Sequence, residues 1–131
     1  MLWPVDTGGL MTKCVFVVDD NALMRTLLTA TLRAGGYEVD AAAGGSEALA
    51  RMRERPPGVV LMDLQMPEMS GAETLQAMRA DPALREIPVV AITAFLHPDG
   101  RDAALADGFD GYLAKPIPST TLLQEVGRRF Y

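Results

Sequence analysis

The stretch Gly58-Val-Val-Leu-Met62, followed at once by Asp63, decides the fold class of this 131-residue chain. A short run of apolar, partly β-branched residues is typical of a parallel strand that is buried on both faces of its sheet. Pro56-Pro57 ends the helical pattern that precedes this run, because proline cannot continue a helix. A strand buried in this way needs helices on both faces of its sheet, which predicts an α/β fold.

The same alternation of apolar runs and helical patterns extends from this strand in both directions. Strands are expected at residues 13–18, 37–42, 58–62, 87–92 and 110–113. Helices are expected between residues 21 and 35 and at residues 46–55, 70–80, 101–107 and 119–130. Five strands alternating with five helices predict right-handed crossovers and a parallel sheet covered on both faces.

Capping residues and apolar spacing indicate where the helices begin and which faces they bury. Asn21 has the chemistry of a helix N-cap, and Ser70 and Glu73 have the spacing of a capping box. In the first helix we expect one apolar face, made of Leu23, Leu27, Ala30 and Ala34. In the last helix we expect the inward face to consist of Leu122, Leu123, Val126 and Phe130.

The composition indicates one ordinary globular domain at residues 11–131, preceded by a flexible leader or tag at residues 1–10. The net charge of −5 disfavours binding to the phosphate backbone of nucleic acids. The single cysteine, Cys14, excludes an internal disulfide and is typical of a cytoplasmic protein. No apolar run approaches the ~18 residues needed to cross a membrane.

Polar side chains stand at the ends of four of the five expected strands. They are Asp19 and Asp20 after the first, Asp63 after the third, Thr93 after the fourth and Lys115 after the fifth. Each alone has an ordinary explanation as a helix cap, a loop hydroxyl or a surface charge. Ligands of open parallel sheets bind beyond the carboxyl ends of the strands, so the conjunction of all five favours a functional site there.

Electrostatics indicates what such a site holds. Two carboxylates about 4 Å apart repel each other by about 4 kcal/mol at an effective dielectric constant near 20. The cluster must therefore protonate, separate or bind a cation, and oxygen ligands suit Mg²⁺. A zinc site is disfavoured, because Cys14 lies inside a strand and His97 is the only histidine. A metal ion, an ammonium group and a hydroxyl together suit a phosphoryl group, which a carboxylate can attack.

Four segments resemble, in order, the motifs of the response-regulator receiver domain of two-component signalling. They are Val17-Val-Asp-Asp-Asn21, Leu61-Met-Asp-Leu-Gln-Met-Pro-Glu-Met-Ser-Gly71, Val90-Ala-Ile-Thr-Ala94 and Tyr112-Leu-Ala-Lys-Pro116. The resemblance spans about residues 13–130 and is to the single-domain, chemotaxis-receiver-like type. It implies a flavodoxin-like (βα)5 fold with a five-stranded parallel sheet in the order 2-1-3-4-5.

The resemblance also implies the chemistry of the acidic residues. Asp63 would be the phospho-acceptor, taking a phosphoryl group from a phosphohistidine on a histidine kinase or a histidine phosphotransfer protein. Asp20, Asp63 and the backbone carbonyl of Gln65 would ligate Mg²⁺, or Mn²⁺ in its place. Asp19 would act through a metal-bound water molecule. Lys115 would pair with the phosphoryl oxygens.

A conformational switch is implied as well. Thr93 would move toward the phosphorylated Asp63, Tyr112 would turn inward, and the surface of the fourth helix, fifth strand and fifth helix would change. The Lys115–Pro116 peptide bond would be cis. A local change of charge would thus bias a two-state element.

Functions from other classes fit the sequence less well. In an aspartate-nucleophile phosphatase a second aspartate acts as general acid two residues after the nucleophile, where this chain has Gln65, which cannot protonate a leaving group. A receiver-like adaptor that binds partners without phosphorylation is disfavoured by the intact Asp63 and Lys115. We therefore expect a signalling protein rather than an enzyme, whose only reactions are its own phosphorylation and dephosphorylation.

The output is expected to pass through contacts with a downstream protein target, because no effector domain follows residue 131. A stand-alone regulator that is monomeric, or that dimerises weakly on phosphorylation, fits this organisation. A receiver excised from a hybrid histidine kinase is the alternative.

Overall fold

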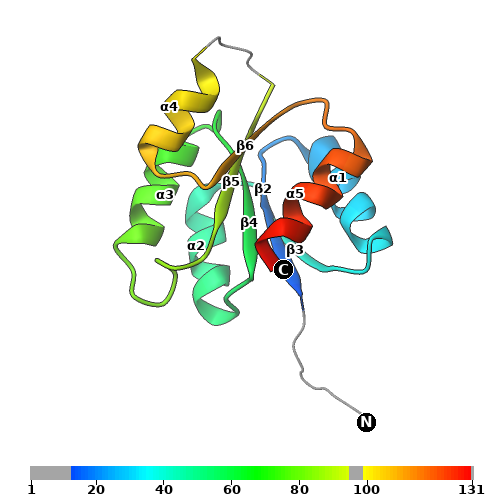
Figure 1. Ribbon diagram of the computed structural model, residues 1–131. Helices are drawn as coiled ribbons and strands as arrows, with labels where there is room; N and C mark the ends of the chain where they lie inside the picture. The colour runs from blue at the N-terminus through cyan, green and yellow to red at the C-terminus, as the bar shows by residue number, and fades with distance from the viewer. Residues whose placement is uncertain (1–12, 95–98, 131) are drawn as a thin grey trace.

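The structure, a computed structural model, describes residues 13–94 and 99–130. The leader expected at residues 1–10 and the histidine at position 97 lie outside the described residues. Five strands form one sheet: β2 (Cys14–Val18), β3 (Glu38–Ala42), β4 (Val59–Asp63), β5 (Val89–Thr93) and β6 (Gly111–Ala114). All pairs are parallel and the order is β3-β2-β4-β5-β6 (Figure 1), which confirms the order 2-1-3-4-5.

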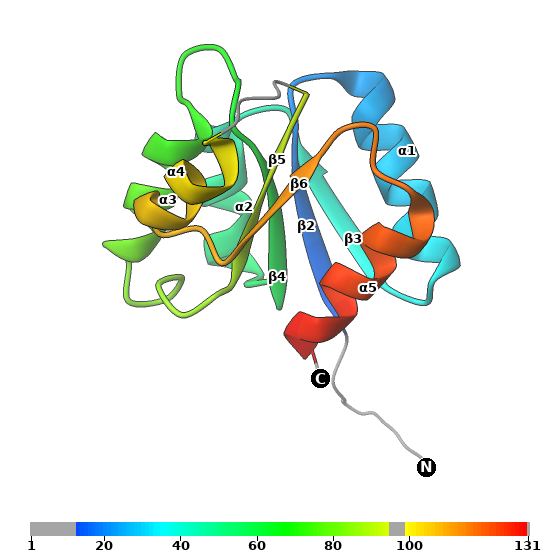
Figure 2. The ribbon, with the colours of Figure 1, turned by 45° about the horizontal axis from the view of Figure 1, so that its top comes forward.

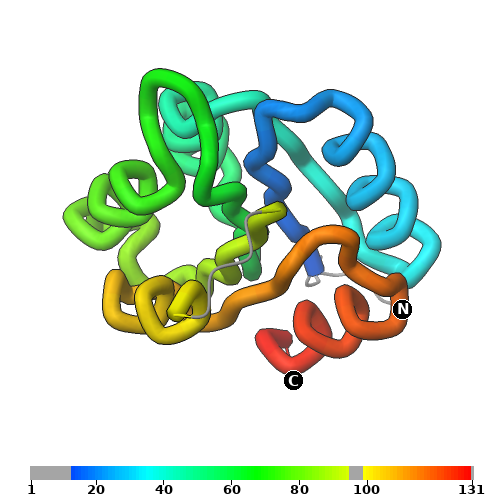
Figure 3. Tube along the Cα trace, turned by 90° about the horizontal axis from the view of Figure 1, so that it is seen from above, coloured from blue at the N-terminus to red at the C-terminus, as the bar shows by residue number. Residues whose placement is uncertain are grey.

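Five helices connect and cover these strands. They are α1 (Ala22–Ala34), α2 (Gly45–Glu54), α3 (Gly71–Arg79), α4 (Gly100–Asp107) and α5 (Ser119–Phe130). Helices α1 and α5 lie on one side of the sheet and α2, α3 and α4 on the other (Figures 2 and 3). Among the described residues, no helix has both the length and the apolar character that a membrane crossing requires.

The predicted helix caps are present. The Asn21 side chain accepts a hydrogen bond from the backbone N–H of Met24, and Ser70 and Glu73 form a reciprocal capping box at the start of α3. Helix α4 ends at Gly108, whose φ of 106° lies in the left-handed region that favours glycine. Each of these signals is local, so the sequence alone was sufficient to find it.

The expected buried face of α1 is wrong. Leu23 and Leu27 are 68% and 52% exposed, and Ala30 and Ala34 are exposed as well. Leu28 and Leu32 are buried instead, in the core cluster beneath α1 and α5. Apolar residues occupy more than one side of this helix, so spacing alone did not decide which side faces the sheet. The expected inward face of α5 is confirmed, since all four of its residues pack in that same cluster.

The two leucines at the boundary of this face should respond differently to truncation. We expect Leu28→Ala to lower the free energy of unfolding by about 3 kcal/mol, because it removes a fully packed side chain. Leu27→Ala, one residue earlier on the exposed side, should change it by less than about 0.5 kcal/mol. Urea unfolding of both variants measures the difference, and equal losses would contradict this orientation of α1.

Candidate functional site

The carboxyl edge of the sheet gathers the polar residues predicted from the sequence. Asp19 directly follows β2, Asp63 is the last residue of β4, and Lys115 directly follows β6. A cavity of about 370 Å³ opens there, lined by Asp20, Asn21, Asp63, Gln65, Ala94 and Lys115. Parallel strands end at the same edge of a sheet, so residues distant in the sequence meet at this cavity.

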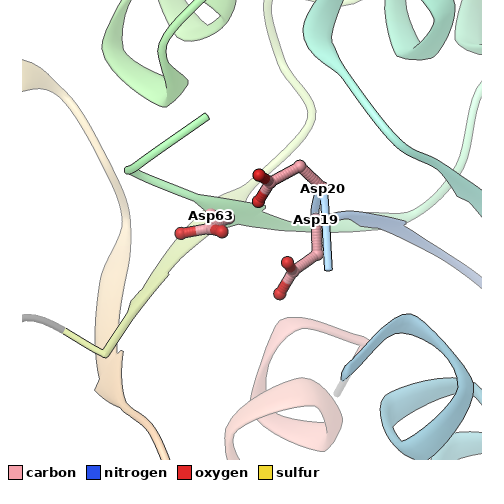
Figure 4. Close-up of side chains that lie close together, drawn as sticks. All are labelled: Asp19, Asp20 and Asp63. Carbon is pink, nitrogen blue, oxygen red and sulfur yellow. The ribbon is translucent and has the colours of Figure 1, made fainter. Parts of the chain in front are cut away.

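Three carboxylates form a tight cluster in this cavity. Asp19, Asp20 and Asp63 each offer an oxygen atom, and these atoms lie within 4.8 Å of one another. Asp19 and Asp63 are buried, whereas Asp20 is exposed. Figure 4 shows the three side chains at the ends of β2 and β4, which are neighbours in the sheet. Their mutual repulsion favours a bound cation at this position.

Asp19 is a fixed, fully bonded carboxylate. Its side chain is 0% exposed. Its Oδ1 accepts a hydrogen bond from the backbone N–H of Asn21 at 2.9 Å, and its Oδ2 accepts one from Lys115 Nζ at 2.7 Å. Its backbone N–H donates to the carbonyl of Ala42 on β3 at 3.2 Å. With both oxygens engaged, Asp19 is suited to orient its neighbours rather than to move toward a ligand.

Lys115 bridges the two buried acids. Its Nζ lies 2.7 Å from Asp19 Oδ2 and 3.4 Å from Asp63 Oδ2, and its side chain is 10% exposed. The backbone N–H of Lys115 donates to the carbonyl of Thr93 at 2.7 Å, which ties the end of β6 to the end of β5. The Lys115–Pro116 peptide bond is cis, as the resemblance implied. The ammonium group thus compensates the charge of two buried carboxylates.

Asp63 has an unusually basic carboxyl group. Its pKa is raised to about 6, chiefly by burial and in part by the nearby Asp19 carboxylate, while the backbone N–H of Gln65 and the Lys115 ammonium act in the opposite direction. The Gln65 N–H donates to Asp63 Oδ1 at 3.1 Å. Gly71, at the start of α3, packs so close that a Cβ there would lie 2.5 Å from the Asp63 carbonyl oxygen. The glycine therefore lets the start of α3 pack directly against the backbone at the end of β4.

This raised pKa predicts a pH-dependent stability in the metal-free protein. The Asp63 carboxyl binds a proton more readily in the folded than in the unfolded chain. Its contribution to the free energy of unfolding therefore falls as the pH rises from about 4 to 6. Asp63→Asn removes the ionised form, and we expect it to raise the free energy of unfolding at pH 7 by about 1–2 kcal/mol. Near pH 4 the two proteins should be equally stable. Denaturant unfolding in EDTA measures the stability of the wild type and of Asp63→Asn at each pH. A difference between them that does not vary with pH would contradict a raised pKa for Asp63.

The donor set fits a hard divalent cation. Asp20 is exposed, and its carboxylate makes no hydrogen bond to any other residue that the structure describes. Asp63 and Gln65 line the same cavity. Mg²⁺ typically takes one or two carboxylates and completes its shell with water. The nitrogen and sulfur ligands typical of zinc are absent from this cavity in the described part of the chain.

Thr93 and Tyr112 lie beside the acidic cavity rather than in its wall. Thr93 is 2% exposed. It lines a second cavity of about 190 Å³ together with Gln65, Gly100 and Tyr112. The Tyr112 ring is half-buried, and its hydroxyl lies so close to Gly100 that a Cβ there would be 2.6 Å away. Gln65 belongs to both cavities, which connects the acidic cluster to α4.

Sequence reasoning missed two residues that line the acidic cavity. Asn21 was assigned only as a helix cap, and Ala94 was not singled out. Both directly follow residues at strand ends, so their place in the chain was an available signal.

Comparison with known proteins agrees with this geometry. The family described as "Response regulator receiver domain" matches residues 15–127. The polar-differentiation response regulators DivK of Brucella ovis and Brucella suis are 38% identical over 116 residues, covering 88% of this chain and 94% of theirs.

Solved structures give the same result. The Vibrio cholerae chemotaxis protein CheY4 is 34% identical, with a TM-score of 0.84 over 90% of this chain and 98% of its own. A putative response regulator from Chloroflexus aurantiacus is 28% identical, with a TM-score of 0.85 over 91% of this chain and 98% of its own. With this agreement in sequence and fold, the chain belongs to the response regulator receiver family of two-component signal transduction.

Proposed function

We propose that this protein accepts a phosphoryl group on Asp63 from a phosphohistidine of a histidine kinase or a histidine phosphotransfer protein. The observation that carries the proposal is the Asp63 carboxylate, buried at the end of β4 beside two further acids and the Lys115 ammonium. An Asp63 oxygen attacks phosphorus, the P–N bond of the donor breaks, and an acyl phosphate forms. Such transfers depend mainly on positioning and on neutralising charge.

Asp20, Asp63 and the backbone carbonyl of Gln65 would hold Mg²⁺, which would neutralise charge on the phosphoryl oxygens. Mn²⁺ suits the same oxygen ligands. Asp19, fixed by its two hydrogen bonds, would act on the metal through a water molecule rather than as a direct ligand. Lys115 turns its ammonium group from the Asp63 carboxylate to the incoming phosphoryl oxygens, which carry more negative charge.

The signal then passes from the acidic cluster to the surface formed by α4, β6 and α5. The Thr93 hydroxyl moves toward the phosphorylated Asp63, and the Tyr112 ring turns into the space that Thr93 leaves. Support comes from the second cavity, which Thr93 and Tyr112 both line and which reaches α4 at Gly100. Phosphorylation thus acts as a local change of charge that selects one of two packings.

The partners in this scheme are proteins. The phosphohistidine partner approaches the acidic edge, and Leu23 and Leu27 on α1, the helix that follows Asp20 in the chain, expose apolar side chains to it. A downstream target reads the surface of α4, β6 and α5. We place the exchange in the cytoplasm, where Cys14 stays reduced, with a monomer or a weak phosphorylation-dependent dimer as the signalling species.

The test is direct labelling of the purified protein with a small phosphodonor. With acetyl phosphate and Mg²⁺, we expect the mass to increase by one phosphoryl group, and EDTA to prevent the increase. Beryllofluoride with Mg²⁺ should shift the amide resonances of Asp63, Thr93 and Tyr112. An adaptor that works without phosphorylation would show neither response, so two negative results would favour that function instead.

A further inference from the structure

Arg25, in the first turns of α1, reaches back to the end of β2. Its Nη1 donates a hydrogen bond to the backbone carbonyl oxygen of Asp19 at 2.7 Å. This oxygen belongs to the peptide unit that joins Asp19 to Asp20. The bond therefore fixes the plane of the peptide group that includes the backbone nitrogen of Asp20.

Asp20 depends on this support more than the other two acids do. The carboxylates of Asp19 and Asp63 are buried and each accepts hydrogen bonds from the protein. The Asp20 carboxylate is exposed and makes no hydrogen bond to another described residue, so the backbone sets its position. The Arg25 guanidinium is the side chain that holds the carbonyl of that backbone.

The charge of Arg25 and its hydrogen bond have opposite effects on a bound cation. A positive charge near the cluster repels Mg²⁺ and weakens its binding. A bond that keeps a ligand in place favours binding, because less freedom is lost when the cation arrives. The sign of the change in Mg²⁺ affinity on removing Arg25 therefore distinguishes the two effects.

We propose that Arg25 is a positioning residue of the acidic cluster, which strengthens Mg²⁺ binding by fixing the peptide between Asp19 and Asp20. This inference rests on the proposed function, because it needs the cluster to bind Mg²⁺. Arg25 acts through the backbone and is not among the residues that line the acidic cavity. Mutation of a residue that supports a metal ligand without binding the metal typically lowers metal affinity by about 10–100-fold.

The test is Mg²⁺ binding by the full chain, measured by calorimetry with Mg²⁺ alone. We expect Arg25→Ala to weaken binding by about tenfold. Arg25→Gln, which loses the charge but keeps an N–H donor, should weaken it less. In the metal-free protein, the amide protons of Asp20 and Asn21 should exchange faster in Arg25→Ala than in the wild type.

The matched control lies on the same helix. Arg33 also donates to a backbone carbonyl, that of Val39 at 3.3 Å, but in the last turn of α1. Arg33→Ala should leave Mg²⁺ affinity unchanged.

Mg²⁺ binding by Arg25→Ala that is equal to or tighter than that of the wild type would overturn the inference while leaving the proposed function intact. If Arg25→Ala does not fold, Arg25→Gln decides by the same criterion. A wild-type protein that does not bind Mg²⁺ would overturn both the inference and the proposed function.

Discussion

Asp63→Asn should lower the yield of phosphorylated protein by about a hundredfold or more, because the amide that replaces the carboxylate is not a nucleophile. The geometry makes this a specific test, since Asp63 is the buried acid within 3.4 Å of the Lys115 ammonium at the end of β4. The same variant is expected to be more stable than the wild type at pH 7. Loss of labelling together with a gain in stability would separate a chemical effect from unfolding.

The labelling experiment needs an aspartate that lies outside the site. Asp81 follows α3 at the opposite edge of the sheet, where its carboxylate pairs with Arg53 at 2.8 Å. Acetyl phosphate should label Asp81→Asn to the same extent as the wild type. Full labelling of Asp63→Asn would show that another residue accepts the phosphoryl group.

Lys115→Met should lower the free energy of unfolding at pH 7 by about 3 kcal/mol in the absence of divalent cations. The reason is that Asp19 and Asp63 would keep buried charges without the ammonium group that compensates both. Without the ammonium group the pKa of Asp63 rises above its wild-type value of about 6, so the loss should shrink as the pH falls toward 6 and the carboxyl of the variant becomes protonated. Added Mg²⁺ should restore part of the stability by taking the place of the missing positive charge.

An exposed ion pair provides the comparison for this variant. Arg85 and Glu86 lie 3.8 Å apart with side chains that are 60% and 91% exposed. Arg85→Met should change the free energy of unfolding by less than about 0.5 kcal/mol, since water already screens this pair. Thermal or urea unfolding of both variants checks the contrast, and similar small losses would show that Lys115 does not stabilise the acidic cluster.

The regular elements of this protein follow from its sequence. The apolar run before Asp63, the Asn21 cap and the Ser70–Glu73 capping box are local signals, and each is where it was predicted. The convergence of polar residues on one edge also follows, because parallel strands place their carboxyl ends together. The strand order came from the resemblance to receiver domains and not from the residue pattern.

Contacts between distant segments decided which residues are buried and which charges pair. Helix α1 carries apolar residues on more than one side, and packing against the sheet selected Leu28 over Leu27. Asp19 and Asp20 are adjacent in the sequence and chemically alike, yet one is buried and bonded while the other is exposed. Lys115 pairs with acids 96 and 52 residues earlier in the chain. Periodicity and capping are set by neighbours in sequence, whereas burial and charge pairing depend on which distant segments meet, and only the tertiary structure determines that.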